Sequence, residues 1–115
     1  MRNLRNRVQL IGNIGKEPVV KTFESGKTKA TFSLATTEQY YDQNGKKVQD
    51  TQWHNLVAWG KTASFVENYL ERGSRIAVEG KLTHRSYEDE QGNTRYITEV
   101  VVGEIMMLTS KQASA

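Results

Sequence analysis

The chain has 115 residues, a formal net charge of +3 and a sequence pI of about 9.2, which fits one small, mildly basic domain. It contains no cysteine, which excludes disulfides, thiol catalysis, thiolate zinc sites and iron–sulfur clusters, and its two histidines are too few for a metal centre. Its apolar runs are too short for a membrane span or a signal peptide, so we expect a cytoplasmic protein with no cofactor, no metal and no membrane partner.

The first half of the chain is rich in Val, Ile, Thr and Tyr in alternation with polar residues, a pattern that predicts half-buried strands. The predicted strands are residues 7–14, continued after a break by residues 19–23, then residues 28–40 and residues 52–59. The sequence DQNG at residues 42–45 predicts a hairpin, because Asn-Gly accepts the positive φ that tight turns need.

The periodicity changes in the second half. Apolar residues recur at helical spacing within residues 61–72, which predicts a short helix with Thr62 as its N-cap and Gly73 as its stop. Alternation then returns in residues 74–87 and 95–102, with an extension over residues 105–108 and a second hairpin at residues 91–93.

Three strands, one short helix and two strands is the element order of an OB-fold, a five-stranded Greek-key barrel with a helix between its third and fourth strands. A helix of about ten residues cannot cover a flat five-stranded sheet, so closure into a barrel is the better way to remove exposed edges. We therefore predict an all-β OB-fold domain over residues 1–110, with residues 111–115 as a short disordered end.

Three aromatic residues lie off the core side of their predicted strands. In the third strand Leu56 and Ala58 share the core side, which places Trp53 and Trp59 on the opposite side, and Tyr87 is outward on the fourth strand. Each base stacked on such a ring gains about 1–3 kcal/mol whatever its identity. Outward rings therefore favour binding of single-stranded nucleic acid, with core burial as the alternative for any one ring.

The outward side of the fourth strand also carries three cations, Arg75, Lys81 and Arg85. This row suits a phosphate backbone, and its alternative is an ordinary charged surface. Tyr40 is ambiguous, because strict alternation places it on the core side unless the strand bulges or bends, and Tyr41 is its rival for an outward position.

We find no arrangement of residues that predicts catalysis. The two GKT sequences, at residues 26–28 and 60–62, lack the glycine that a P-loop needs five residues earlier, and the acidic run at residues 88–90 lacks the spacing of a calcium loop. His54 lies on the core side of its strand, which favours a packed or interface histidine over a general base. The sequence therefore predicts no catalytic residue and no metal ligand.

Several stretches of the chain resemble bacterial single-stranded DNA-binding proteins. They are residues 6–15 (NRVQLIGNIG) followed by 17–18 (EP), 32–36 (FSLAT), 51–57 (TQWHNLV), 59–61 (WGK), 69–73 (YLERG), 78–80 (VEG), 95–96 (RY) and 98–102 (TEVVV). In order and spacing they cover about residues 3 to 108. The resemblance implies an OB-fold homotetramer, associated with the bacterial nucleoid, that wraps single-stranded DNA without sequence preference in replication, recombination and repair.

The resemblance also implies roles for individual residues. Its stacking positions fall on Tyr40, Trp53, Trp59 and Tyr87, which favours Tyr40 over Tyr41. Its DNA-backbone contacts fall on Arg7, Lys61, Arg72 and Arg85, and His54 matches a subunit-interface position. Family members normally continue into a flexible linker with an acidic tip that recruits replication and repair enzymes. This sequence ends at Ala115 with neither, as a truncated or a naturally tail-less member would, so these residues predict no recruitment of such enzymes through a tail.

Two other functions fit the same fold. A primosome-type OB-fold adaptor would act mainly through protein–protein contacts, as a dimer rather than a tetramer. A nuclease or other hydrolase built on this barrel would cleave DNA in a metal-dependent way, which the missing ligand clusters argue against.

Overall fold

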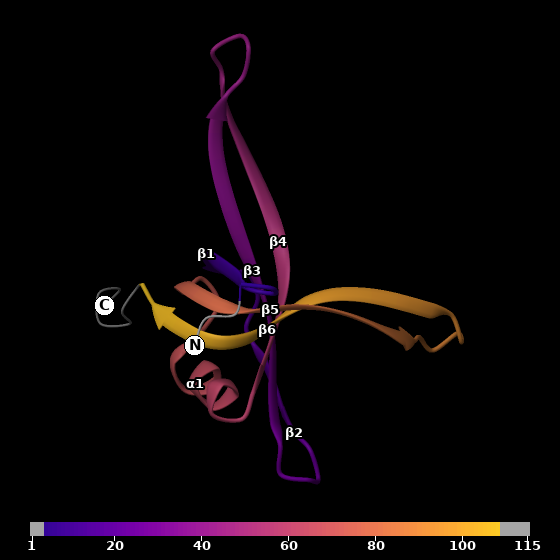
Figure 1. Cartoon of the computed structure of the whole chain (residues 1–115). Coiled ribbons are helices and arrows are strands. Elements are labelled where there is room, and N and C mark those ends of the chain that lie inside the picture. Colours follow the sequence, from indigo (N-terminus) through magenta and orange to yellow (C-terminus); the bar gives the residue numbers. More distant parts are fainter. Residues whose placement is uncertain (1–3, 109–115) are drawn as a thin grey trace.

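The computed structural model describes residues 4–108 and consists of six strands and one helix (Figure 1). In chain order these are β1 (Val8–Ile14), β2 (Val19–Thr22), β3 (Thr28–Tyr41), β4 (Lys47–Trp59), α1 (Lys61–Tyr69), β5 (Arg75–Glu88) and β6 (Thr94–Met107). The segment predicted to be a disordered end, residues 111–115, lies outside the described residues. Within residues 4–108 no helix has the length and apolar character to cross a membrane.

Five strands form a closed ring, which confirms the predicted OB-fold barrel. They pair in the order β1, β5, β6, β4 and β3, and β3 pairs again with β1 to close the ring. The β4–β6 pairing is parallel and the others are antiparallel. The segment predicted to continue the first strand is a separate short strand, β2, which pairs with β3. Helix α1 joins β4 to β5, as predicted, and packs against β3, β4 and β6.

Glycine permits the close crossings that let the barrel close. A Cβ atom on Gly12 of β1 would overlap the carbonyl oxygen of Ala35 on β3, and one on Gly80 of β5 would overlap the carbonyl oxygen of Val101 on β6. Beside Gly80 the β5–β6 register shifts by one residue at Gly103, which makes a β-bulge in β6. The barrel therefore needs glycine at these two positions, where the backbones of neighbouring strands come too close together for a side chain.

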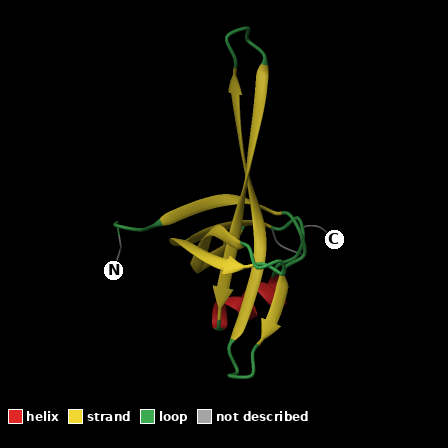
Figure 2. Ribbon diagram, turned by 90° about the vertical axis from the view of Figure 1, so that its right-hand side faces the viewer, coloured by secondary structure: helices red, strands yellow, loops and turns green. Residues whose placement is uncertain are grey.

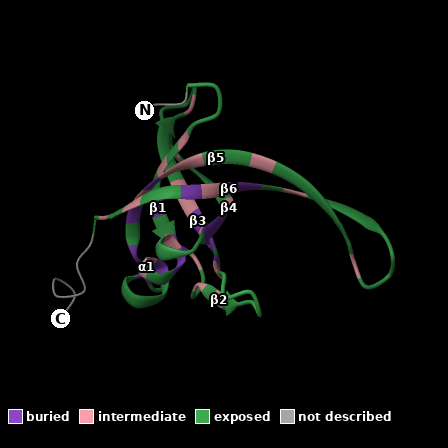
Figure 3. Cartoon of the chain, turned by 60° about the horizontal axis from the view of Figure 1, so that its bottom comes forward, coloured by how far each residue is buried: buried purple, intermediate pink, exposed green. Residues whose placement is uncertain are grey.

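The hydrophobic core lies inside this ring, and the β2–β3, β3–β4 and β5–β6 hairpins extend beyond it (Figures 1 and 3). The largest fully buried side chains are Leu34, Leu56, Val66, Ile76 and Val78. The outer halves of β3–β4 and β5–β6 project as two-stranded arms in different directions (Figure 1). Alternation with Ile76 and Val78 predicts a core position for Leu82 as well, but Leu82 is 38% exposed although it pairs with the buried Val100.

The three hairpins end in the same kind of turn. Gly26, Gly45 and Gly92 have φ values of 91°, 77° and 80°, and each donates its amide to the carbonyl three residues earlier. In two of these turns the side chain of Asp42 or Asp89 accepts two further backbone N–H groups. Both predicted hairpins are confirmed, although the positive φ falls on the glycine and not on the asparagine of Asn-Gly.

The ends of the helix differ from those predicted. Thr62 lies inside the first turn of α1, and Gly60 precedes the helix with a φ of 60° and no side-chain cap. The prediction of Thr62 as N-cap is wrong because Gly60, bonded through its amide to the carbonyl of Thr28, turns the chain directly from β4 into the helix. The helix also stops at Tyr69, because Leu70 adopts an extended conformation and is buried.

Candidate nucleic-acid interface

Both tryptophans lie on the outer face of the β3–β4 ladder. Trp53 pairs with Ala35 and Trp59 pairs with Lys29, so the two indoles project from the same side of the ladder, about 20 Å apart along β4. Their exposed fractions are 62% and 42%, respectively. The structure thus places both rings at the surface, on the side expected from alternation.

The end of β1 holds the indole of Trp53. A Cβ atom on Gly15 would overlap the ring atom Cζ3 of Trp53, and it would lie 2.8 Å from Cη2 and 3.0 Å from the hydroxyl oxygen of Ser33. The indole therefore packs on bare backbone at Gly15, which covers part of the ring and leaves the rest open to solvent. A base could stack on this open part.

The indole of Trp59 lies beside a second ring that the sequence did not single out. The ring centroids of Trp59 and Phe23 are 6.1 Å apart with an interplanar angle of 26°, and the ammonium nitrogen of Lys29 is 5.5 Å from the Trp59 ring. A hollow of about 610 Å³ adjoins Trp59 and is lined by Lys61 among other residues. The structure therefore brings the predicted residues Trp59 and Lys61 together.

Tyr40 and Tyr41 lie near the far end of the β3–β4 arm, and both are exposed. The pairing runs without a shift from Lys29 opposite Trp59 to Tyr41 opposite Lys47, so the bulge that would turn Tyr40 outward is not present in this ladder. By register Tyr41 shares the side of Trp53, and Tyr40 has the opposite side. The ladder twists strongly, and its two strands cross in the view of Figure 2, so its faces turn along the arm.

Tyr87 and Arg85 form a ring-and-cation pair on the β5–β6 arm. The guanidinium carbon of Arg85 lies 6.0 Å from the centroid of the Tyr87 ring. The Nε–H group of Arg85 donates to a carboxylate oxygen of Glu99 at 2.7 Å, and the Glu99 side chain is only 8% exposed. This hydrogen bond and the charge of Glu99 raise the pKa of Arg85, which fixes the guanidinium as a cation.

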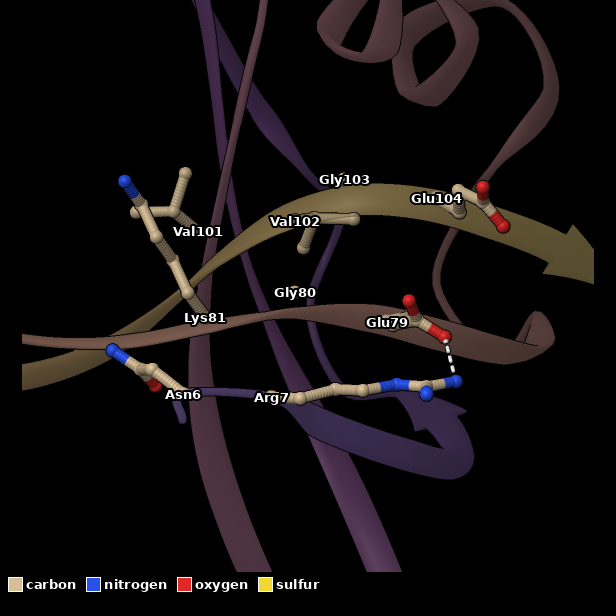
Figure 4. Close-up of a pocket in the computed structure, with 9 residues that line it drawn as sticks. All are labelled: Asn6, Arg7, Glu79, Gly80, Lys81, Val101, Val102, Gly103 and Glu104. Atoms are coloured by element: carbon tan, nitrogen blue, oxygen red, sulfur yellow. Dashed lines mark hydrogen bonds and ion pairs between the residues drawn. The ribbon is translucent and has the colours of Figure 1, made fainter. Parts of the chain in front are cut away.

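Arg7 and Lys81 line another hollow, of about 400 Å³, where β1 meets β5 and the bulge of β6 (Figure 4). Arg7 donates to a carboxylate oxygen of Glu79 at 2.7 Å. Figure 4 shows Lys81 pointing away from this ion pair. Asn6 fixes the segment before β1 with two 2.9 Å hydrogen bonds between its side-chain amide and the backbone of Leu82.

Arg72 and Arg75 lie between α1 and the start of β5, next to the end of β1, where the Ile14 carbonyl accepts the amide of Gly73. Arg72 is exposed in the turn after α1. Arg75 donates to the side-chain oxygen of Asn13 at 3.2 Å and lies on the outer face of the β1–β5–β6 part of the barrel, where Ile11 and Met106 are exposed. The predicted cations are therefore spread over more than one face of the chain.

His54 lies on the side of β4 opposite the tryptophans, as alternation predicts, and pairs with Leu34. Its side chain is half-buried, and Nε2 lies 2.9 Å from the hydroxyl oxygen of Thr36. A neighbouring hydroxyl thus fixes the ring in the monomer, and its predicted role at a subunit interface stays a prediction.

The barrel and its surface define a class of protein. Aromatic rings lie open on the outer side of a closed OB-fold barrel and on its two arms, with Lys29 beside Trp59 and Arg85 beside Tyr87. Rings that accept any base, next to groups that neutralise phosphates, are the features of an OB-fold domain that binds single-stranded nucleic acid. Within residues 4–108 no three His, Cys, Asp or Glu side chains come together in an arrangement that could hold a metal ion.

Comparison with known proteins agrees with this class. Residues 5–108 match the single-strand binding protein family, and the chain belongs to this family. It is 45% identical to the single-stranded DNA-binding protein of Bacteroides thetaiotaomicron, over 95% of this chain and 69% of that protein. It is 42% identical to single-stranded DNA-binding protein 1 of Xylella fastidiosa, over 93% of this chain and 79% of that protein.

A solved structure shares the whole architecture. The Plasmodium falciparum SSB in complex with ssDNA superposes with a TM-score of 0.82 at 31% identity, covering 95% of this chain and 98% of that one. The resemblance inferred from the sequence and the OB-fold are therefore confirmed. The family consists of DNA-binding proteins without enzymatic activity, so this chain is not an enzyme, and the adaptor alternative is not favoured.

Proposed function

We propose that this chain binds single-stranded DNA without sequence preference, by stacking bases on exposed rings and neutralising phosphates with lysine and arginine. The observation that carries the proposal is the outward exposure of Trp53 and Trp59 on one face of the β3–β4 ladder, with Lys29 and Lys61 beside Trp59. Relatives named single-stranded DNA-binding proteins, 42–45% identical to this chain, support it.

The arms favour wrapping rather than a single short contact. The proposed stacking residues are Tyr40, Trp53, Trp59 and Tyr87, and the proposed phosphate contacts are Arg7, Lys61, Arg72, Arg75, Lys81 and Arg85. Because Tyr40 and Tyr87 lie on arms that leave the barrel in different directions, a strand that visits all four rings must bend around the domain. At Arg7 and Arg85 a phosphate would have to share the guanidinium with a carboxylate.

The chain is also proposed to assemble as a homotetramer in the bacterial cytoplasm and to coat DNA during replication, recombination and repair. The apolar side chains of Ile11 and Met106, exposed on the outer face of β1, β5 and β6, support self-association, since burying apolar surface gains about 25 cal/mol per Å². His54 is the proposed interface histidine. Light scattering with and without oligo-dT measures this mass; a dimer would favour the adaptor function.

The test of DNA binding is a fluorescence titration with oligo-dT at increasing salt, with double-stranded DNA of equal length as control. Trp53 and Trp59 should be quenched by the single strand, and log K should fall with log salt by about 0.7 per phosphate neutralised. Unchanged tryptophan emission would contradict base stacking on either indole. Affinity that does not respond to salt would contradict the phosphate contacts.

A further inference from the structure

The β2–β3 hairpin carries cations and a ring on a single face. Lys21 pairs directly with Lys29, and the backbone of Phe23 bonds across the turn to Lys27, so these four side chains project on the same side. Lys29 in turn pairs with Trp59 on β4. Lys21, Phe23, Lys27, Lys29 and Trp59 together are called the lysine–ring face.

The lysine–ring face concentrates positive charge that the protein itself does not neutralise. Lys21 and Lys29 are directly opposite each other, and like charges in that position destabilise a sheet. The ammonium nitrogen of Lys21 lies 5.0 Å from the ring centroid of Phe23, and that of Lys29 lies 5.5 Å from the ring centroid of Trp59. Across residues 4–108 the ion pairs all involve arginine, so no carboxylate pairs with Lys21, Lys27 or Lys29. The turn contains Glu24, but this residue makes no ion pair with them.

The two rings of this face are both accessible. Phe23 is 36% exposed and lies against Trp59 at a centroid distance of 6.1 Å. That distance is too short to hold a base between the rings, so a base must stack on an outer side of one of them. The hollow beside Trp59 is lined by Lys27 and also by Lys61, which adds one more cation next to the ring pair.

The position of this face relative to Trp53 suggests its ligand. Trp53 and Trp59 share the outer face of β4, and Lys29 and Lys21 follow on the two next strands, within about 10 Å of Trp59 across the sheet. A DNA strand that leaves Trp53 and reaches Trp59 therefore meets Lys29, Lys21 and Phe23 next. This arrangement repeats, beyond the barrel, the combination of ring and cation found at the other sites.

We propose that the β2–β3 hairpin is a further binding segment for single-stranded DNA, in which Phe23 stacks one base and Lys21 and Lys29 hold phosphates. The inference rests on the proposed function, since it extends the same strand of DNA past Trp59. In this proposal Lys21 of β2 and Lys29 of β3 are opposite each other because both bind the same anionic ligand, the DNA backbone.

Phe23→Ala tests the ring. Oligo-dT should bind about 5- to 150-fold more weakly, the loss expected for one stacked base. Phe23→Trp should restore affinity. The matched control is Tyr69→Ala, which removes an exposed ring from α1, away from the lysine–ring face, and should bind as the unaltered protein does. Equal affinity for Phe23→Ala and the unaltered protein would overturn the role of the ring.

The double variant Lys21→Gln/Lys29→Gln tests the charges. Its plot of log K against log salt should be less steep by about 1.4, which is two contacts at about 0.7 each. Lys21→Arg/Lys29→Arg keeps both charges and should keep the slope. Because removing a like-charge pair relieves repulsion, the melting temperature of the glutamine variant should stay equal or rise. A lower melting temperature with an unchanged slope would mean that the lysines are structural and would overturn the inference.

The same measurements distinguish loss of the hairpin contact from loss of DNA binding as a whole. If the unaltered protein is quenched by oligo-dT with a salt-dependent affinity while all hairpin variants bind equally well, this inference is wrong and the proposed function stands. If the unaltered protein itself shows neither quenching nor salt dependence, the proposed function is wrong and the inference falls with it.

Discussion

Replacing Trp53 by alanine separates a binding ring from a structural one. The indole is 62% exposed, so about 38% of it is covered, chiefly by the backbone at Gly15. A buried tryptophan hides up to about 250 Å². The covered part is then about 100 Å², worth at most about 2.5 kcal/mol at about 25 cal/mol per Å². Trp53→Ala should therefore stay folded, whereas its affinity for oligo-dT should fall by about 1–3 kcal/mol, or about 5- to 150-fold.

The assay measures affinity and stability on the same variants. Fluorescence polarisation of a labelled oligo-dT gives the dissociation constant without relying on tryptophan emission, and a thermal melt gives the stability. Trp53→Phe is the control, because it keeps a ring on Gly15 and should lose less affinity than the alanine variant. Two results would refute the reasoning: an unfolded Trp53→Ala variant, which would make the indole a core residue, or a folded variant with unaltered affinity.

Three further predictions concern stability and are each checked by thermal melts. Gly12→Ala should destabilise the barrel by about 1–3 kcal/mol, because its methyl group would overlap a backbone carbonyl of β3; an unchanged melting temperature would show that the crossing can open. Glu99→Ala should cost about 1–2 kcal/mol, because it removes the buried partner of the partly exposed Arg85; a smaller loss would make the ion pair a surface contact. Asp89 has a pKa below its ordinary value of about 3.9 because it accepts hydrogen bonds from Arg95 and from turn amides, so its stabilising effect is complete above that pH and is lost as the pH falls through the lower folded value. Asp89→Asn should therefore have a lower melting temperature than the unaltered protein at neutral pH and the same melting temperature in strong acid. A difference that persists in acid would contradict the stabilising role of the ionised carboxylate.

Alternation predicts orientation well where one side of a strand is buried. Leu56 and Ala58 are fully buried in the barrel, and the two tryptophans that alternate with them are consequently outside. The same rule says little about Tyr40, because the arm that carries it has no buried side against which to count. Orientation on the arms depends on twist and register, which a single sequence does not show.

Two other features depend on contacts between distant segments. Thr62 has the composition of an N-cap, but the turn at Gly60 is held by β3, so the helix begins without it. In the sequence Phe23 is the last residue of a predicted strand, and only its alternation with Lys21 indicates that the two side chains share a face. Its importance appears when β2 pairs with β3 and β3 pairs with β4, which brings it next to Trp59.

The hairpin arms contribute reach without contributing to the core. Among the described residues, the core cluster contains none from the outer parts of β3–β4 and β5–β6, and the turns at their tips are completed by their own glycine and aspartate. Inserting two residues into each strand of an arm would preserve the alternation of side chains between its two faces and would leave the barrel unchanged. The length of polynucleotide that one subunit can engage is therefore adjustable independently of how firmly that subunit folds.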